Sequence, residues 1–152
     1  MAKFIFKMQN ILEVKLKLED QAKTVYASAV EALEREKEKQ RQLEEKKESY
    51  EERLTELMYE SLKVSEICRM ENAVEIMKYR IHEQMIAVRN AQLQLDKAQK
   101  KLHEAMVERK TYEKLKEKAF EEFKLEVNAQ EKKEVDELVS YTYSRPREQA
   151  AF

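Results

Sequence analysis

The fold of this chain is decided by the stretch ICRMENAVEIMKYRIHEQMIAVRNAQLQLDKAQKKL, residues 67–102. An aliphatic residue returns at every seventh position, and a second series of mostly small or apolar residues follows it three positions later. The first series is Ile67, Val74, Ile81, Val88, Leu95 and Leu102, and the second is Met70, Met77, Gln84, Ala91, Ala98 and Ala105. This heptad spacing predicts a coiled-coil helix, and we call the row of residues that faces the partner helix the seam.

The first half of the chain carries a weaker version of the same pattern. Its predicted seam, with steps of three and four, is Ile11, Val14, Leu18, Ala22, Val25, Ala29 and Leu33, then Leu43, Lys47, Tyr50, Leu54, Leu57, Ser61 and Val64 beyond the polar Glu36 and Gln40. The charged block at 34–53 contains opposite charges at helical spacing, such as Glu38 and Arg41. Such a block is typical of a solvated helix face. A binding surface for a charged partner is the alternative.

The composition agrees with long helices and limits the partners. Charged residues make up 40% of the 152 residues, glycine and tryptophan are absent, and Pro146 is the single proline. With 30 basic and 31 acidic residues, the net charge of −1 argues against a nucleic-acid partner. The single Cys68 excludes an intrachain disulfide and indicates a reducing compartment. No apolar run reaches the about 20 residues of a membrane span, so we expect a cytoplasmic protein without direct membrane insertion.

Two predicted helices need a turn, which no glycine or proline marks. The stretch SLKVS at 61–65 suits it, because Ser65 can cap a following helix and Glu66 favours the positive end of the helix dipole. A short connection makes the helices antiparallel neighbours. The fold class is therefore all-α, a long antiparallel two-helix coiled-coil hairpin. The predicted elements are a helix at 3–60, a turn at 61–65 and a helix at 66–140, together one domain at 1–140, and a flexible tail at 141–152.

Antiparallel pairing about residue 63 sets residue i opposite residue 126 − i, so the second helix extends past the first. The pairing brings Phe4 and Phe6 close to Phe120 and Phe123. These rings either close the open end of the hairpin or stay partly exposed as an anchor, since aromatic residues often dominate binding energy. Beyond residue 126, the apolar residues form a thin stripe that belongs either to a solvated helix or to a partner site. They are Val127, Val135 and Leu138.

The sequence offers little for catalysis. Both histidines, His82 and His103, fall beside the predicted seam, and neither begins an H-E-x-x-H motif. Cys68 alone cannot form a zinc ligand cluster, and a chain without glycine has no phosphate-cradling glycine-rich loop. We therefore expect no enzymatic activity, no metal and no cofactor.

Both ends of the predicted hairpin carry a family resemblance. FIFKMQNILEVKLKLEDQAK, residues 4–23, resembles the opening of the flagellar export protein FliJ family. YEKLKEKAFEEFKLEVNAQEKKEVDEL, residues 112–138, resembles the closing segment of the same family. The resemblance implies a soluble component of the bacterial flagellar type III export apparatus, similar to the central stalk of rotary ATPases. It places the protein in the cytoplasm, peripheral to the export apparatus at the inner membrane.

The resemblance also implies partners and two partner-binding surfaces. The partners are the hexameric flagellar export ATPase, the cytosolic domain of the export gate membrane protein, and export chaperones. The ATPase surface at the open end comprises Phe4, Phe6, Phe120, Phe123, Val127 and Leu138, and the gate surface near the turn comprises Leu43, Tyr50, Ala73, Met77 and Gln84. Ala73 and Gln84 depart from the family pattern. Leu43, Tyr50 and Met77 also lie on the predicted seam, which predicts core packing for them.

Two other functions are compatible with the pattern. A purely structural coiled coil would self-associate as a four-helix dimer, whereas a stalk that works with other proteins is expected to be a monomer. The central shaft of a vacuolar-type rotary ATPase has a similar plan, but that family usually carries a small inserted domain, for which the predicted turn has no room. Solution mass separates the dimer from the monomer.

Overall fold

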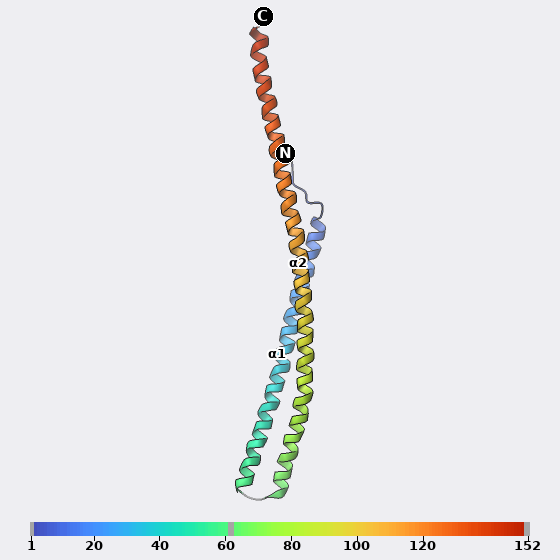
Figure 1. Ribbon diagram of the computed structural model, residues 1–152, viewed down its shortest axis with the longest axis vertical. Helices are drawn as coiled ribbons and strands as arrows, with labels where there is room; N and C mark the ends of the chain where they lie inside the picture. Colours follow the sequence, from blue (N-terminus) through green and yellow to red (C-terminus); the bar gives the residue numbers. More distant parts are fainter. Residues whose placement is uncertain (1, 61–62, 151–152) are drawn as a thin grey trace. The chain divides into compact units, whose positions relative to one another are not determined.

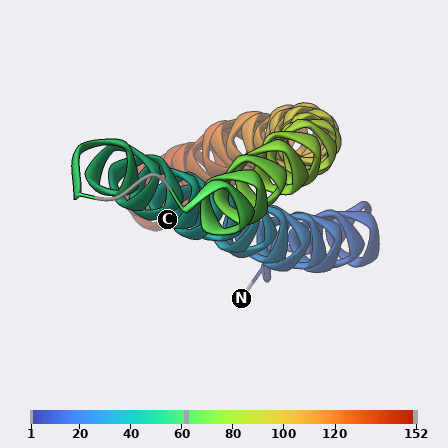
Figure 2. The ribbon, with the colours of Figure 1, turned by 90° about the horizontal axis from the view of Figure 1, so that it is seen from below.

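The chain folds as two antiparallel helices. The computed structural model describes residues 2–60 and 63–150, with side chains up to residue 143. Helix α1 spans Gln9–Glu60 and helix α2 spans Val64–Ala150 (Figure 1). The end of α1 and the start of α2, both drawn in green, lie side by side in two views (Figures 1 and 2). The predicted all-α hairpin is confirmed, and the residues that the structure describes include no strand.

The chain divides into two compact units, and both helices contribute to each of them. The first unit comprises Met1–Leu18 and Met106–Phe152, and the second comprises Glu19–Ala105. The second unit therefore holds the hairpin connection and most of α1. The first unit holds the N-terminal segment and the part of α2 that extends past the start of α1 (Figure 1).

The predicted seam of α2 is confirmed along its whole length. Val74, Met77 and Ala98 are the most buried of its residues, with 7%, 6% and 4% of their surface exposed. The other positions of the two heptad series are half-buried. The continuation of the seam beyond residue 105 is half-buried as well, at Arg109, Tyr112, Lys116, Ala119 and Phe123. An unbroken heptad repeat therefore located the buried face of α2 correctly.

The predicted seam of α1 is right toward the turn and wrong near its start. Leu33 and Leu57 are buried, but the four apolar residues predicted to face α2 between positions 11 and 25 are exposed by about half. They are Ile11, Val14, Leu18 and Val25. The residues that are buried or half-buried here are Leu12, Lys15, Glu19, Ala22 and Tyr26. Val64, predicted as the last seam position, is also exposed, and Ser61 lies outside the described residues.

The displaced seam has a physical reason in the residues that α2 presents. In the first unit the seam of α2 is largely polar, with Arg109, Tyr112 and Lys116. Lys15 of α1 contacts this polar seam: its Nζ lies 2.9 Å from Glu108 Oε2 and 5.9 Å from the centroid of the Tyr112 ring. The pKa of Lys15 is raised, first by its hydrogen bond to Glu108. Because polar groups need partners when they are covered, a polar face of α2 selects a polar face of α1. The apolar Ile11, Val14 and Leu18 are left as an exposed row, called here the α1 stripe.

Helix α1 begins at Gln9, later than the predicted start at residue 3. The segment before it contains Phe4, Ile5 and Phe6, which are weak helix formers. Phe6 is buried, and its carbonyl accepts a hydrogen bond from the Gln9 backbone N–H at 3.2 Å. The packing of these aromatic side chains therefore holds the segment in a non-helical path that leads into α1.

Helix α2 begins at Val64, so the prediction that Ser65 caps it is wrong. The Lys63 carbonyl accepts hydrogen bonds from the backbone N–H groups of Glu66 and Ile67, each at 3.1 Å, and this places Lys63 at the N-cap. Glu66 lies in the first turn, as predicted. Residues 61–62 of the predicted turn lie outside the described residues. At the other end, α2 is helical to Ala150, whereas a tail was expected from residue 141.

Candidate partner-binding surfaces

The open end of the hairpin holds a cluster of four phenylalanines, Phe4, Phe6, Phe120 and Phe123, called here the aromatic cluster. The Phe4 ring meets Phe120 edge-on, with centroids 5.2 Å apart and planes at 69°. Its centroid lies 5.4 Å from that of Phe123. Edge-to-face and tilted contacts at this distance are favourable because the ring edge is positive and the ring face is negative. The predicted approach of the two chain segments is confirmed.

The aromatic cluster is mostly directed inward. Phe6 is buried, while Phe4 and Phe123 are half-buried. Phe120 is the most open of the four, with 39% of its surface exposed, and the Lys124 ammonium lies 4.8 Å from its ring centroid. The cluster therefore fastens the N-terminal segment to α2, and Phe120 is its member best placed to contact another molecule.

An open groove runs beside this cluster on α2. Its lining residues are Ala2, Phe123, Glu126, Val127, Gln130, Glu131 and Glu134. Val127, one of the predicted site residues, is half-buried there. Three glutamates give the groove an acidic lining, so it suits a basic partner better than an acidic one.

From the groove onward, α2 continues as a single helix, and we call residues 126–143, which include most of the groove lining, the extension. Every residue from 128 to 143 is exposed. Leu138, another predicted site residue, has 65% of its surface exposed, and the neighbouring Val135 and Val139 have 56% and 48%. The extension carries five acidic residues and two lysines. It is therefore an acidic helix with an uncovered apolar row.

The predicted gate surface contains a polar contact between the two helices. Gln84 Nε2, on α2, donates to the Glu36 carbonyl oxygen at 2.8 Å and to Glu36 Oε2 at 2.6 Å. These bonds stabilise the charged carboxylate, so the pKa of Glu36 lies below its ordinary value, with the Gln84 hydrogen bond as the largest cause and Lys39 as a further one. A polar pair at a seam position fixes the register of the helices.

The other gate residues divide between the core and the surface. Met77 is buried, and Tyr50 and Ala73 are half-buried. Leu43 and Gln84 line a shallow groove that also involves Lys39, Gln42 and Lys46. Of the five predicted residues, Leu43 and Gln84 are therefore the pair that the structure brings together at a surface.

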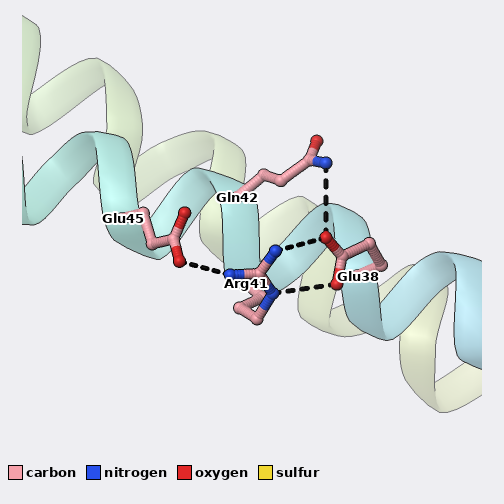
Figure 3. A network of polar contacts seen from close by, with 4 residues as sticks. All are labelled: Glu38, Arg41, Gln42 and Glu45. Carbon is pink, nitrogen blue, oxygen red and sulfur yellow. Dashed lines mark hydrogen bonds and ion pairs between the residues drawn. The ribbon is translucent and has the colours of Figure 1, made fainter.

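Part of the charged block of α1 is paired within the helix. Arg41 donates from Nε to Glu38 Oε2 at 2.8 Å and from Nη2 to Glu38 Oε1 at 2.5 Å, and its Nη1 pairs with Glu45 (Figure 3). Gln42 Nε2 donates to the same Glu38 carboxylate at 3.4 Å (Figure 3). The hydrogen bond from Arg41 lowers the pKa of Glu38. These contacts stay within one helix face and favour the solvated-face interpretation of the block.

The remaining chemistry-bearing residues form no centre in the part of the chain that the structure describes. His82 and His103 are exposed, and Cys68 is an exposed thiol. No group of three histidine, cysteine, aspartate or glutamate side chains there could hold a metal ion. Within the same described residues, neither helix has a segment long and apolar enough to cross a bilayer.

The comparison with protein families decides the identity. Residues 4–148 match the family described as flagellar FliJ protein. The chain belongs to the flagellar FliJ family. The flagellar FliJ protein of Bacillus subtilis (strain 168) is 30% identical over 133 residues, which cover 88% of this chain and 90% of that protein. The FliJ family is a non-enzymatic component of flagellar export.

The fold of this FliJ-family chain is also found in a solved structure. A YscO homolog from Chlamydia trachomatis superimposes with a TM-score of 0.70, covering 96% of this chain and 99% of that one. The sequence identity is 20%, so the likeness concerns the fold. The two-helix hairpin is therefore shared between chains that differ at most positions.

Sequence reasoning missed three features of this FliJ-family chain. They are the Lys15–Glu108 ion pair, the burial of Glu19 and the Glu36–Gln84 contact. The last had a partial signal, because both residues interrupt otherwise apolar seams, but pairing about residue 63 sets Glu36 opposite residue 90 and does not bring it to Gln84. The sequence of α1 alone did not indicate the Lys15–Glu108 ion pair or the burial of Glu19, because both depend on the residues of α2 that face them.

Proposed function

We propose that the chain is a stalk and adaptor of the flagellar type III export apparatus, with the open end of its hairpin in the ring of the hexameric export ATPase. The observation that supports this is the extension, an exposed acidic helix that continues beyond the aromatic cluster. Membership of the FliJ family supports the flagellar setting. In this proposal the protein works in the cytoplasm, against the export apparatus at the inner membrane.

The mechanism needs an asymmetric insert in a symmetric ring. A single helix such as the extension presents different residues to each ring subunit, with Leu138 on one side and the acidic Asp136 and Glu137 on others. A ligand shifts the equilibrium of a protein only by binding its states with different affinity. The extension would therefore favour one conformation in the subunits that meet its apolar row, and so promote ring assembly and turnover.

The adaptor part of the proposal concerns the export gate and the export chaperones. The groove of Leu43 and Gln84 offers the gate domain an apolar side chain between Lys39 and Lys46. For chaperones, α2 offers exposed apolar side chains elsewhere in the second unit. These are Ile76, Ile86 and Leu93, each with 51% of its surface exposed.

Two truncated chains test the ATPase role. A chain that ends after Phe123 lacks the extension, and a matched chain that ends after Tyr143 keeps it. We expect the first to lose stimulation of the purified export ATPase and the second to retain it, with circular dichroism showing that both remain helical. An unchanged ATPase rate with the shorter chain, still folded, would overturn the placement of the open end in the ring.

A point substitution distinguishes binding of the export gate from stimulation of the ATPase. Leu43→Asp puts a charge into the groove, and Glu44→Lys, its neighbour on the exposed face of the block, is the control. We expect Leu43→Asp to weaken binding of the gate's cytosolic domain in isothermal calorimetry and to leave ATPase stimulation intact. If Leu43→Asp bound the gate domain as tightly as the control does, the groove would not be the gate-binding surface.

A further inference from the structure

Two exposed rows in the first unit have the same spacing. The α1 stripe consists of Ile11, Val14 and Leu18, exposed by 42%, 52% and 43%. On the extension, Val135, Leu138 and Thr142 repeat the same steps of three and four. Rows with this spacing are what two helices need in order to pack along a shared seam.

The charges of the two segments are opposite. Residues 2–18, which contain the α1 stripe, carry one glutamate and four lysines, of which Lys15 pairs with Glu108 of its own chain, whereas the extension carries five acidic residues and two lysines. Oppositely charged faces attract one another and resist like-charged alternatives. The extension therefore fits the α1 stripe in charge as well as in spacing.

The extension cannot reach the α1 stripe of its own chain. Lys15 contacts Glu108 and Tyr112, which fixes the level of α2 at which the stripe lies. Leu138 lies 26 residues farther along the same continuous helix, which is about 39 Å at about 1.5 Å per residue. An extension that covers the α1 stripe must therefore come from a second copy of the chain.

We propose that two copies of the chain associate through their open ends, with each extension lying parallel on the α1 stripe of the other. The shared spacing sets the register: Val135 beside Ile11, Leu138 beside Val14, and Thr142 beside Leu18. The contact is reciprocal, as a two-fold symmetric dimer requires. This proposal replaces the expectation of a monomer and is independent of the proposed export function.

The dimer has a consequence for partner binding. An extension that lies on a second copy is withheld from any other protein that uses the same helix. Because the two segments are oppositely charged, the association weakens as salt screens the charges. A concentrated pool of the free protein would then keep its extensions covered until a stronger partner displaces the second copy.

Disulfide crosslinking between two differently tagged chains tests the register. In a Cys68→Ser background, a Val14→Cys chain is mixed with a Leu138→Cys chain and oxidised. A disulfide needs Cα atoms within about 4.4–6.8 Å, so a mixed-tag product requires the proposed contact. The control replaces Leu138→Cys by Lys133→Cys, on another face of the extension. A Val14–Leu138 yield no higher than the Val14–Lys133 yield would overturn the proposal.

Sedimentation measures the same contact without cysteines. We expect the mass of the native chain to rise with concentration toward that of a dimer, and Leu138→Lys to abolish the rise. Leu93→Lys, at an exposed position of the second unit, should leave it intact. A monomer at every concentration, or equal effects of the two leucine substitutions, would refute the association.

Discussion

Replacing Leu12 by alanine should destabilise the first unit much more than the same change at the adjacent Ile11. Leu12 is 4% exposed on the seam, whereas Ile11 is 42% exposed on the α1 stripe. The spacing of apolar residues in the sequence places Ile11 on the seam instead. The two substitutions therefore distinguish the observed seam from the one that local sequence predicts.

The burial of the two side chains gives the expected sizes. Truncating a buried leucine to alanine costs about 2–5 kcal/mol in protein cores, and a two-helix interface without a third layer belongs at the lower end, about 2–3 kcal/mol. Ile11 keeps much of its surface in water, so its truncation costs about 1 kcal/mol of burial, and the better helix propensity of alanine offsets part of that. The expected difference is about 2 kcal/mol, or about 30-fold in the local opening equilibrium at about 1.36 kcal/mol per factor of ten.

Hydrogen exchange of the amides at 9–18 measures this opening directly, because native-state exchange reports local unfolding free energies. The protein is kept dilute so that association between copies does not protect the α1 stripe. We expect exchange about 30-fold faster in Leu12→Ala than in Ile11→Ala. Equal exchange in the two variants, or faster exchange in Ile11→Ala, would refute the observed seam.

Three further predictions concern the other contacts. Phe4→Ala removes two ring contacts, each worth about 0.5–1.5 kcal/mol, so trypsin should cut faster after Lys7; an unchanged rate would contradict the fastening role of the aromatic cluster. The lowered pKa of Glu36 means that its contribution is present above its ordinary value of 4.5 and is lost as pH falls through the folded-state pKa. The urea midpoint of the native chain should therefore fall more steeply between pH 6 and pH 3 than that of Gln84→Leu, and parallel curves would count against the bond. Arg41→Ala, on an exposed face, should leave the urea midpoint nearly unchanged. A large drop in that midpoint would show that Arg41 stabilises the fold through contacts other than its pairs on that face.

The heptad repeat of α2 was readable from the sequence because it is local. A residue that recurs every seven positions faces the partner helix whatever that partner is, so Val74, Met77 and Ala98 could be assigned to the core without knowing what they touch. The meeting of Phe4 with Phe120 and Phe123 followed from a single further assumption, the position of the turn.

The start of α1 was decided by tertiary structure. Apolar residues at two neighbouring helix positions, Ile11 and Leu12, allow two seams, and only the polar residues of α2 opposite them select the seam of Leu12, Lys15 and Glu19. The non-helical path of residues 2–8 likewise depends on burial of Phe6. Sequence periodicity thus determined which helices form and how they pair, while the chemistry of the facing helix determined which side of α1 is buried and which apolar row is left exposed.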